Sequence, residues 1–137
     1  MRIYFDSSAL IKRAIREKES AGFIEAIDRW TSERAAMFSS TLAWIEVTRT
    51  IRSRLDDEPP AEVIQLIENA VAGIAECPIT EQVSDIARRL GPSTLRSLDA
   101  IHLATATLVG ADLVCAYDTR LLTSASELGF RTISPGS

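Results

Sequence analysis

The chain has 137 residues and a formal net charge of −4, with 46% hydrophobic and 25% charged residues. A chain of this length can bury a core without disulfides, and its composition excludes disordered and fibrous proteins. The negative charge counts against a protein that holds nucleic acid mainly through its overall electrostatic field.

Cellular location is predicted from two features of the sequence. No segment is long and apolar enough to cross a membrane. Asp6 interrupts the N-terminal apolar stretch where a signal peptide would still be hydrophobic, so we expect a cytoplasmic protein. Cys77 and Cys115 lie in apolar runs without a nearby cysteine, which favours two buried, reduced thiols over a disulfide.

The first half of the chain alternates short apolar runs with helical periodicity. The expected elements are a strand over 2–5, helices over about 8–18 and 20–33, a strand over 36–39, a helix over about 42–55 with Thr41 as its candidate N-cap, and a helix opened by Pro59 that ends before Gly73.

The second half carries clearer boundaries, because glycine and proline punctuate it. The expected elements are a weak strand over 74–79, a helix from Thr80 that stops at Gly91 and Pro92, a helix over 97–109, a strand over 112–117, a helix over 120–128, and a final strand over 130–134.

This order of elements predicts an α/β fold built as a sandwich around a short, mainly parallel central sheet. No repeat or linker divides the sequence, so we expect a single domain over 1–137. In parallel sheets, ligands bind beyond the carboxyl ends of the strands. Asp6 and Asp118 each follow an expected strand, which predicts that both lie at the same edge of the sheet.

Four acidic residues, Asp6, Glu46, Asp99 and Asp118, interrupt apolar stretches. Glu46 projects from a largely apolar helix and is expected to face the interior or a cleft. Asp99 lies in the first turn of a nearly all-apolar helix, where the helix dipole alone is an alternative explanation. A buried carboxylate is costly unless it is paired, protonated or bound to a metal.

Clustering of these four acids indicates a divalent cation site. Two carboxylates about 5 Å apart repel by roughly 3 kcal/mol at an effective dielectric constant near 20, which bound cations would offset. Mg²⁺ and Mn²⁺ prefer carboxylate and water oxygens and leave positions for a substrate phosphate. With one histidine and two distant cysteines, the chain offers no zinc cluster. The expected chemistry is metal-assisted hydrolysis of a phosphodiester.

Several neighbouring residues have two interpretations each. His102 is either a general acid or base or a hydrogen-bonded histidine near the site. A hydroxyl of Ser7 or Ser8 could orient a metal-bound water or hold a ligand carboxylate, and both roles are compatible with capping the helix that begins there. Arg120 either meets a substrate phosphate or pairs with an acid. The cations that follow Asp6 and Glu46 either contact substrate or lie on solvated helix faces: Lys12, Arg13 and Arg16, and Arg49, Arg52 and Arg54.

Four motifs, in order and over the whole chain, resemble those of the PIN-domain nucleases and, among these, the VapC-type toxins. They are Ile3-Tyr4-Phe5-Asp6-Ser7-Ser8, Trp44-Ile45-Glu46-Val47, Ser97-Leu98-Asp99-Ala100-Ile101-His102-Leu103-Ala104 and Tyr117-Asp118-Thr119-Arg120. The third is the most specific. One departure is Ala116, where many relatives have Thr or Ser.

The resemblance implies a PIN-like three-layer α/β/α sandwich and a Mg²⁺- or Mn²⁺-dependent endoribonuclease. It also implies a homodimer silenced by a cognate VapB-type antitoxin whose tail occupies the acidic cleft. Asp6 and Asp99 would be the most direct metal ligands, Glu46 and Asp118 would complete the acidic set, and Ser8 would support it.

Three alternatives remain at this point. A stand-alone PIN nuclease would have the same site without an antitoxin, and a catalytically silent PIN-like module would bind a partner only. A phosphoacceptor receiver domain is also α/β and binds Mg²⁺, but it needs paired acids after the first strand and a late lysine. In this chain serines follow Asp6, and the lysines are Lys12 and Lys18.

Overall fold

The computed structural model describes residues 1–137. Its elements, in chain order, are β1 (Arg2–Phe5), α1 (Ser7–Leu10), the 3₁₀ helix η1 (Ile11–Arg13), α2 (Ser20–Ser32), β2 (Ala36–Ser40), α3 (Thr41–Arg54), α4 (Pro60–Val71), β3 (Ala75–Cys77), α5 (Glu81–Arg89), α6 (Ser97–Leu108), β4 (Leu113–Cys115), α7 (Thr119–Glu127) and β5 (Arg131–Ile133).

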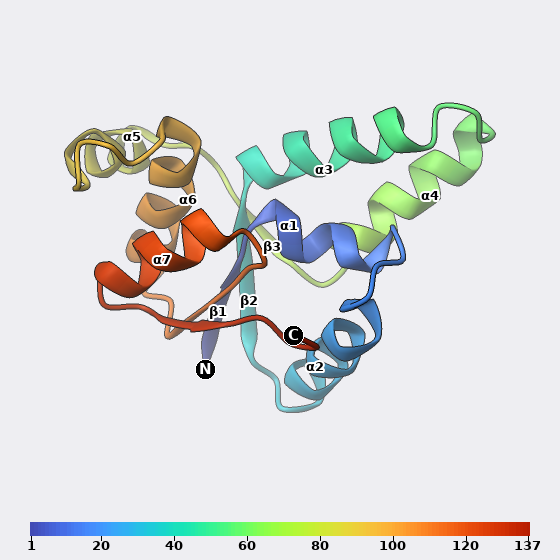
Figure 1. Cartoon of the computed structure of the whole chain (residues 1–137), viewed down its shortest axis with the longest axis horizontal. Helices are drawn as coiled ribbons and strands as arrows, with labels where there is room; N and C mark the ends of the chain where they lie inside the picture. The colour runs from blue at the N-terminus through green and yellow to red at the C-terminus, as the bar shows by residue number, and fades with distance from the viewer.

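The five strands form one sheet in the order β3-β2-β1-β4-β5, and every neighbouring pair is parallel. Helices cover both faces, with α1, α2 and the α3–α4 hairpin on one side and α5, α6 and α7 on the other (Figure 1). This arrangement confirms the predicted α/β/α sandwich. None of the helices has the length and apolar character needed to cross a membrane.

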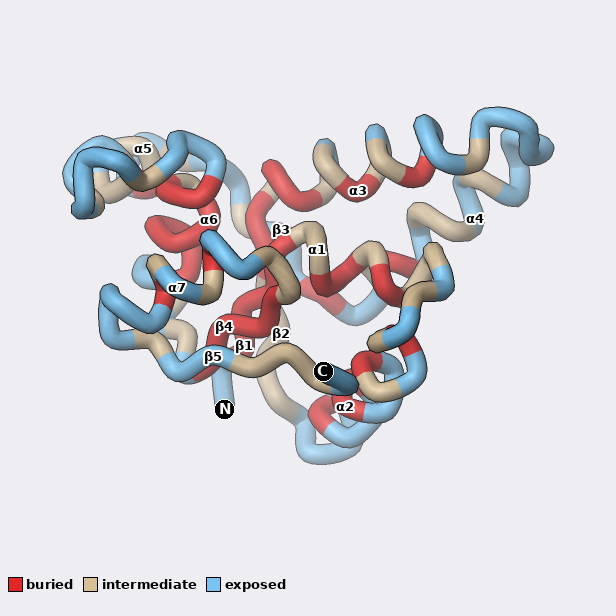
Figure 2. Tube along the Cα trace, in the orientation of Figure 1, coloured by how far each residue is buried: buried red, intermediate tan, exposed pale blue.

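Alternation along β1 separates the two cores. Ile3 and Phe5 pack into a cluster with Phe23 and Trp30 of α2, whereas Tyr4 points to the other face. There it joins a smaller cluster formed with α6, α7 and β4. The central strands and α6 are therefore buried, while the outer part of the α3–α4 hairpin is exposed (Figure 2).

Two expectations about helix ends are wrong. The helix expected to reach residue 18 ends as η1, because the chain turns back so that Glu17 and Glu19 reach the buried ammonium of Lys12, at 3.1 and 2.8 Å. Ion pairs with residues five and seven positions later thus accompany the early end of this helix.

The N-cap of α3 is Ser40 rather than Thr41. The Ser40 hydroxyl accepts a hydrogen bond from the Leu42 N–H at 3.0 Å, while the Thr41 hydroxyl donates to Glu76. The other boundaries fall within a few residues of expectation.

Both cysteines are free thiols, as expected. Only Cys115 is buried, and burial raises the pKa of its thiol well above the usual value. Cys77 is half-exposed, because β3 lies at the edge of the sheet, so the expectation that both would be buried is wrong for this residue.

Candidate active site

The structure brings the four predicted acids to one cleft of about 310 Å³, which we call the acid cleft. Its lining residues are Asp6, Ser7, Ser8, Glu46, Arg96, Ser97, Leu98, Asp99, His102 and Asp118. The acids come from four places in the fold: the end of β1, the first half of α3, the first turn of α6 and the end of β4. The cleft thus lies at the carboxyl edge of the sheet, as predicted from Asp6 and Asp118.

Register explains why residues so distant in sequence meet. Phe5 of β1 pairs with Cys115 of β4, and the Asp6 N–H donates to the Cys115 carbonyl at 3.3 Å. After each of these strands the backbone leaves the sheet and starts a helix, so Asp6 is the N-cap of α1 and Asp118 is the N-cap of α7. The acids therefore begin helices at the same edge.

Asp6 is the most buried of these acids, with 4% of its surface exposed. Its Oδ1 accepts hydrogen bonds from the Ser8 hydroxyl at 2.7 Å and the Ala9 N–H at 3.1 Å. Burial nevertheless raises the pKa of Asp6 to about 6, with the negative charge of Asp118 adding to the rise. A cation in the cleft would oppose that effect.

Ser8 connects Asp6 to the end of β4. Its hydroxyl donates to Asp6 and accepts from the Tyr117 N–H at 2.9 Å. This hydrogen bond has the geometry expected of a serine that holds the Asp6 carboxylate in place. Neither serine caps α1, because Asp6 is its N-cap; Ser7 lines the cleft.

Arg96 joins Asp99 to Asp118 across the cleft. Its Nε lies 3.2 Å from Asp99 Oδ2, and its Nη2 lies 3.5 Å from Asp118 Oδ2. Asp118 uses its other oxygen to accept from the N–H groups of Arg120 and Leu121 at the start of α7. Arg96 was not among the predicted site residues, although its i, i+3 spacing from Asp99 at a helix start was a usable signal.

Glu46 is held by a histidine rather than by a cation. Its Oε1 lies 2.8 Å from His102 Nε2, and the other ring nitrogen lies 2.7 Å from the Tyr4 hydroxyl. Glu46 therefore reaches the cleft as expected, and His102 is hydrogen-bonded beside the site. Tyr4 was not among the predicted site residues, because a tyrosine in a buried strand resembles an ordinary core residue.

The basic residues separate into two groups. Lys12 is buried against Glu17 and Glu19, and Arg13 donates to backbone carbonyls of Ala70 and Ala72, so these two cations belong to the scaffold.

By contrast, Arg49 and Arg52 are exposed on α3, at i+3 and i+6 from Glu46, and form no ion pair within the chain. Arg120 is likewise exposed and unpaired, and with Arg96 and Asp99 it lines a hollow next to the acid cleft. These arginines remain available to a ligand.

The donor set matches a hard divalent cation in its chemistry. Carboxylate and hydroxyl oxygens line the cleft, and these are the ligands that Mg²⁺ and Mn²⁺ prefer. In the present arrangement, however, no three histidine, cysteine, aspartate or glutamate side chains are grouped closely enough to hold a metal ion. The Arg96 guanidinium pairs with Asp99 and Asp118 in this arrangement. The residues that would hold a cation are Asp6, Glu46, Asp99 and Asp118, and Arg96 would compete with it for two of them.

The comparisons with known proteins agree with this fold. The family model described as PIN domain matches residues 3–126. Ribonuclease VapC46 of Mycobacterium tuberculosis is 39% identical over 135 residues, covering 97% of each chain. The chain therefore belongs to the PIN domain family, and within it to the VapC group.

Solved structures show the same fold. VapC20 of Mycobacterium tuberculosis, described as a sarcin–ricin-loop-cleaving toxin, superposes with a TM-score of 0.71 at 15% identity, covering 97% of this chain and 99% of that one. VapBC2 of Rickettsia felis, solved with a promoter DNA fragment, gives a TM-score of 0.73 at 6% identity, covering 98% and 99%. Membership of this family excludes the receiver-domain alternative.

Proposed function

We propose that the chain is a metal-dependent endoribonuclease that acts as the toxin of a toxin–antitoxin pair. The observation that carries the proposal is the convergence of four acidic side chains on one cleft beyond the carboxyl ends of the strands. A relative that is 39% identical over nearly its whole length is named as a ribonuclease, which supports RNA as the substrate.

The four acids have two kinds of role in this proposal. Asp6 and Asp99 hold Mg²⁺ or Mn²⁺ directly, and Glu46 and Asp118 complete the set. When bound, the ion supplies an activated water and stabilises the departing oxygen of the phosphodiester. Ser8 keeps the Asp6 carboxylate turned toward the cleft through its 2.7 Å hydrogen bond.

RNA phosphates are contacted by the unpaired arginines on either side of the acids, Arg49 and Arg52 on α3 and Arg120 on α7. The net charge of −4 does not oppose RNA binding, because the phosphates contact bound cations and these local arginines. RNA is read largely through shape and unpaired bases, so the surface around the cleft decides which RNA is cut.

The partners follow from the exposed surface and from the relatives. An apolar groove of about 550 Å³ lies between α3 and α4, and Ile64 in its wall is 57% exposed. A structural neighbour was solved as a VapBC assembly. We infer a VapB-type antitoxin that silences the toxin by covering the acid cleft, a homodimer as the functional unit, and action in the cytoplasm, where the RNA is.

RNA cleavage by the purified chain tests this proposal. We expect the wild-type chain to cleave total RNA in the presence of Mn²⁺. The cleavage rate of Asp99→Asn should be lower by more than the roughly 10–100-fold that is typical of changes to residues beside a metal ligand. Asp57→Asn is the matched control, because Asp57 is exposed in the turn after α3. Equal cleavage by wild type and Asp99→Asn would refute the site.

A second arm distinguishes a toxin from the alternatives. Growth arrest on expressing the wild-type chain alone, absent with Asp99→Asn, is the expected result. Cleavage in vitro without growth arrest would favour a stand-alone nuclease, and neither activity would favour a binding module.

A further inference from the structure

A continuous polar chain runs from the centre of the sheet to the acid cleft. It starts at Tyr4 in β1, the middle strand, passes through both ring nitrogens of His102 in α6, and ends at Glu46 in α3. The two hydrogen bonds measure 2.7 and 2.8 Å, and the Tyr4 and His102 rings meet edge to face at 5.9 Å. Tyr4 has no exposed surface and His102 has 3%, so water does not compete for the bond between these two residues.

The direction of each bond follows from the chemistry of its groups. A carboxylate only accepts hydrogen bonds, so His102 Nε2 carries the proton that it shares with Glu46. In the neutral imidazole this leaves Nδ1 as an acceptor. The Tyr4 hydroxyl is available as its donor, because burial raises the pKa of the phenol well above its usual value. In a neutral His102, a Tyr4 hydroxyl that donates to Nδ1 therefore selects the tautomer that donates to Glu46 through Nε2.

Glu46 needs such a partner more than the other acids do. Asp6 and Asp118 are short side chains that cap helices and accept backbone N–H bonds. Glu46 has one more rotatable bond, projects from the middle of a helix, and has no backbone donor. Its side chain is 27% exposed, and His102 is its only hydrogen-bond partner.

We propose that Tyr4 and His102 are positioning residues that hold one Glu46 oxygen and so leave the other directed at the cation of the acid cleft. This inference rests on the proposed function, because it assigns a role toward the metal that the cleft is proposed to bind. It makes His102 neither a metal ligand nor a general acid or base: it acts through Glu46.

Two substitutions of His102 separate its hydrogen bond with Glu46 from its hydrogen bond with Tyr4. The amide nitrogen of glutamine can occupy the place of Nε2, so His102→Gln keeps a donor for Glu46. The shorter amide of asparagine matches the Nδ1 side, so His102→Asn keeps the Tyr4 contact and loses Glu46. Both residues are neutral and polar, which makes them matched controls for each other.

Calorimetric titration of Mn²⁺ into the metal-free, full-length chain is the deciding measurement. We expect His102→Asn to weaken Mn²⁺ binding about 10–100-fold, as changes to residues that orient metal ligands do, and His102→Gln to restore most of that affinity. Tyr4→Phe, which removes only one oxygen, should fall between them and supplies the test if His102→Asn does not fold. Equal losses in Gln and Asn variants would overturn the inference.

A double-mutant cycle adds a measurement that a purely structural role would not affect. If His102 acts only through Glu46, His102→Asn should cause no further loss of Mn²⁺ affinity in a Glu46→Gln background. A full additional loss there would overturn the inference while leaving the metal site standing. A wild-type chain that binds no Mn²⁺ would instead overturn the proposed function, and this inference with it.

Discussion

The acid cleft and the outer face of α3 carry opposite charges and are stabilised in different ways. In the cleft, the four acids all have partners within the chain: Ser8, His102, Arg96 or the N–H groups of a helix start. On α3, Arg49 and Arg52 are exposed and have no partner. The cleft is therefore organised by the fold itself, whereas the arginines are left for another molecule to neutralise.

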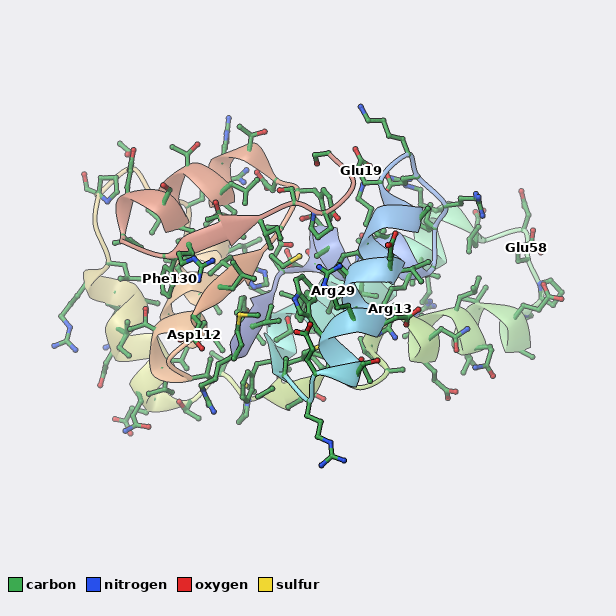
Figure 3. All side chains as sticks on the ribbon, turned by 90° about the horizontal axis from the view of Figure 1, so that it is seen from below. Arg13, Glu19, Arg29, Glu58, Asp112 and Phe130 are labelled. Atoms are coloured by element: carbon green, nitrogen blue, oxygen red, sulfur yellow. The ribbon has the colours of Figure 1, made fainter.

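The interior and the α3–α4 hairpin also differ, in their buried polar atoms and their exposed apolar side chains. Every buried polar side-chain atom of the chain has a hydrogen-bond partner, so the interior leaves nothing unsatisfied. The α3–α4 hairpin instead exposes large apolar side chains, Ile45 and Ile64 among them, and Figure 3 places Glu58 at its tip, at the opposite end of the molecule from Phe130. Leu98 in the wall of the acid cleft is 52% exposed, so exposed apolar surface occurs at both sites.

The largest expected effect concerns the buried charge of Asp6. Its pKa rises from 3.8 in the unfolded chain to about 6 in the folded one, so the folded state binds the proton more tightly. The resulting stability is present below about pH 4 and is lost as the pH rises to about 6, a loss of about 3 kcal/mol at 1.36 kcal/mol per pKa unit.

Asp6→Asn tests that difference, because the amide stays neutral and keeps an acceptor for Ser8 and Ala9. Urea unfolding in EDTA from pH 4 to pH 7 should show the variant gaining on wild type by up to about 3 kcal/mol. Parallel stability curves for the two proteins would show that the fold already compensates this charge.

Arg96 gives the next largest effect, because it is the one cleft residue that opposes a cation. Exposed ion pairs are worth about 0.2–1 kcal/mol each, so removing both of its contacts should tighten Mn²⁺ binding about two- to thirtyfold. Arg96→Gln measured by calorimetry tests this. Arg88→Gln is the control, because Arg88 also pairs with an acid three residues away, Asp85, on the exposed face of α5. Unchanged or weaker binding by Arg96→Gln would show that Arg96 does not compete with the ion.

The acids of the cleft could be predicted from the sequence for a physical reason. Asp6, Glu46, Asp99 and Asp118 were found because charge in an apolar run is costly and because parallel strands share a carboxyl edge. The order of strands and helices along the chain was predicted separately, from short apolar runs and helical periodicity.

Side-chain contacts between residues far apart in the sequence could not be predicted in this way. The contacts of Tyr4 with His102 and of Arg96 with Asp118 span 98 and 22 residues, and no pattern in the sequence specifies them. The early end of the helix after Asp6 involves more local contacts, because Lys12 pairs with Glu17 and Glu19, five and seven residues later. The roles of Asp6, Glu46, Asp99 and Asp118 as metal ligands stay predictions.

The smallest effect should come from α3, and its salt dependence rather than its size identifies it. If Arg49 and Arg52 each contact one phosphate of single-stranded RNA, Arg49→Ser with Arg52→Ser should lower the slope of log affinity against log salt by about 1.4, at about 0.7 per contact. Binding is measured in an Asp99→Asn background so that the RNA stays intact. Arg131→Ser on β5 is the control, because this arginine is also exposed but lies on the edge strand across the sheet. Loss of affinity with an unchanged slope would mean that the arginines support the surface without meeting phosphate, and the contrast between a self-contained cleft and a ligand-binding α3 would then fail.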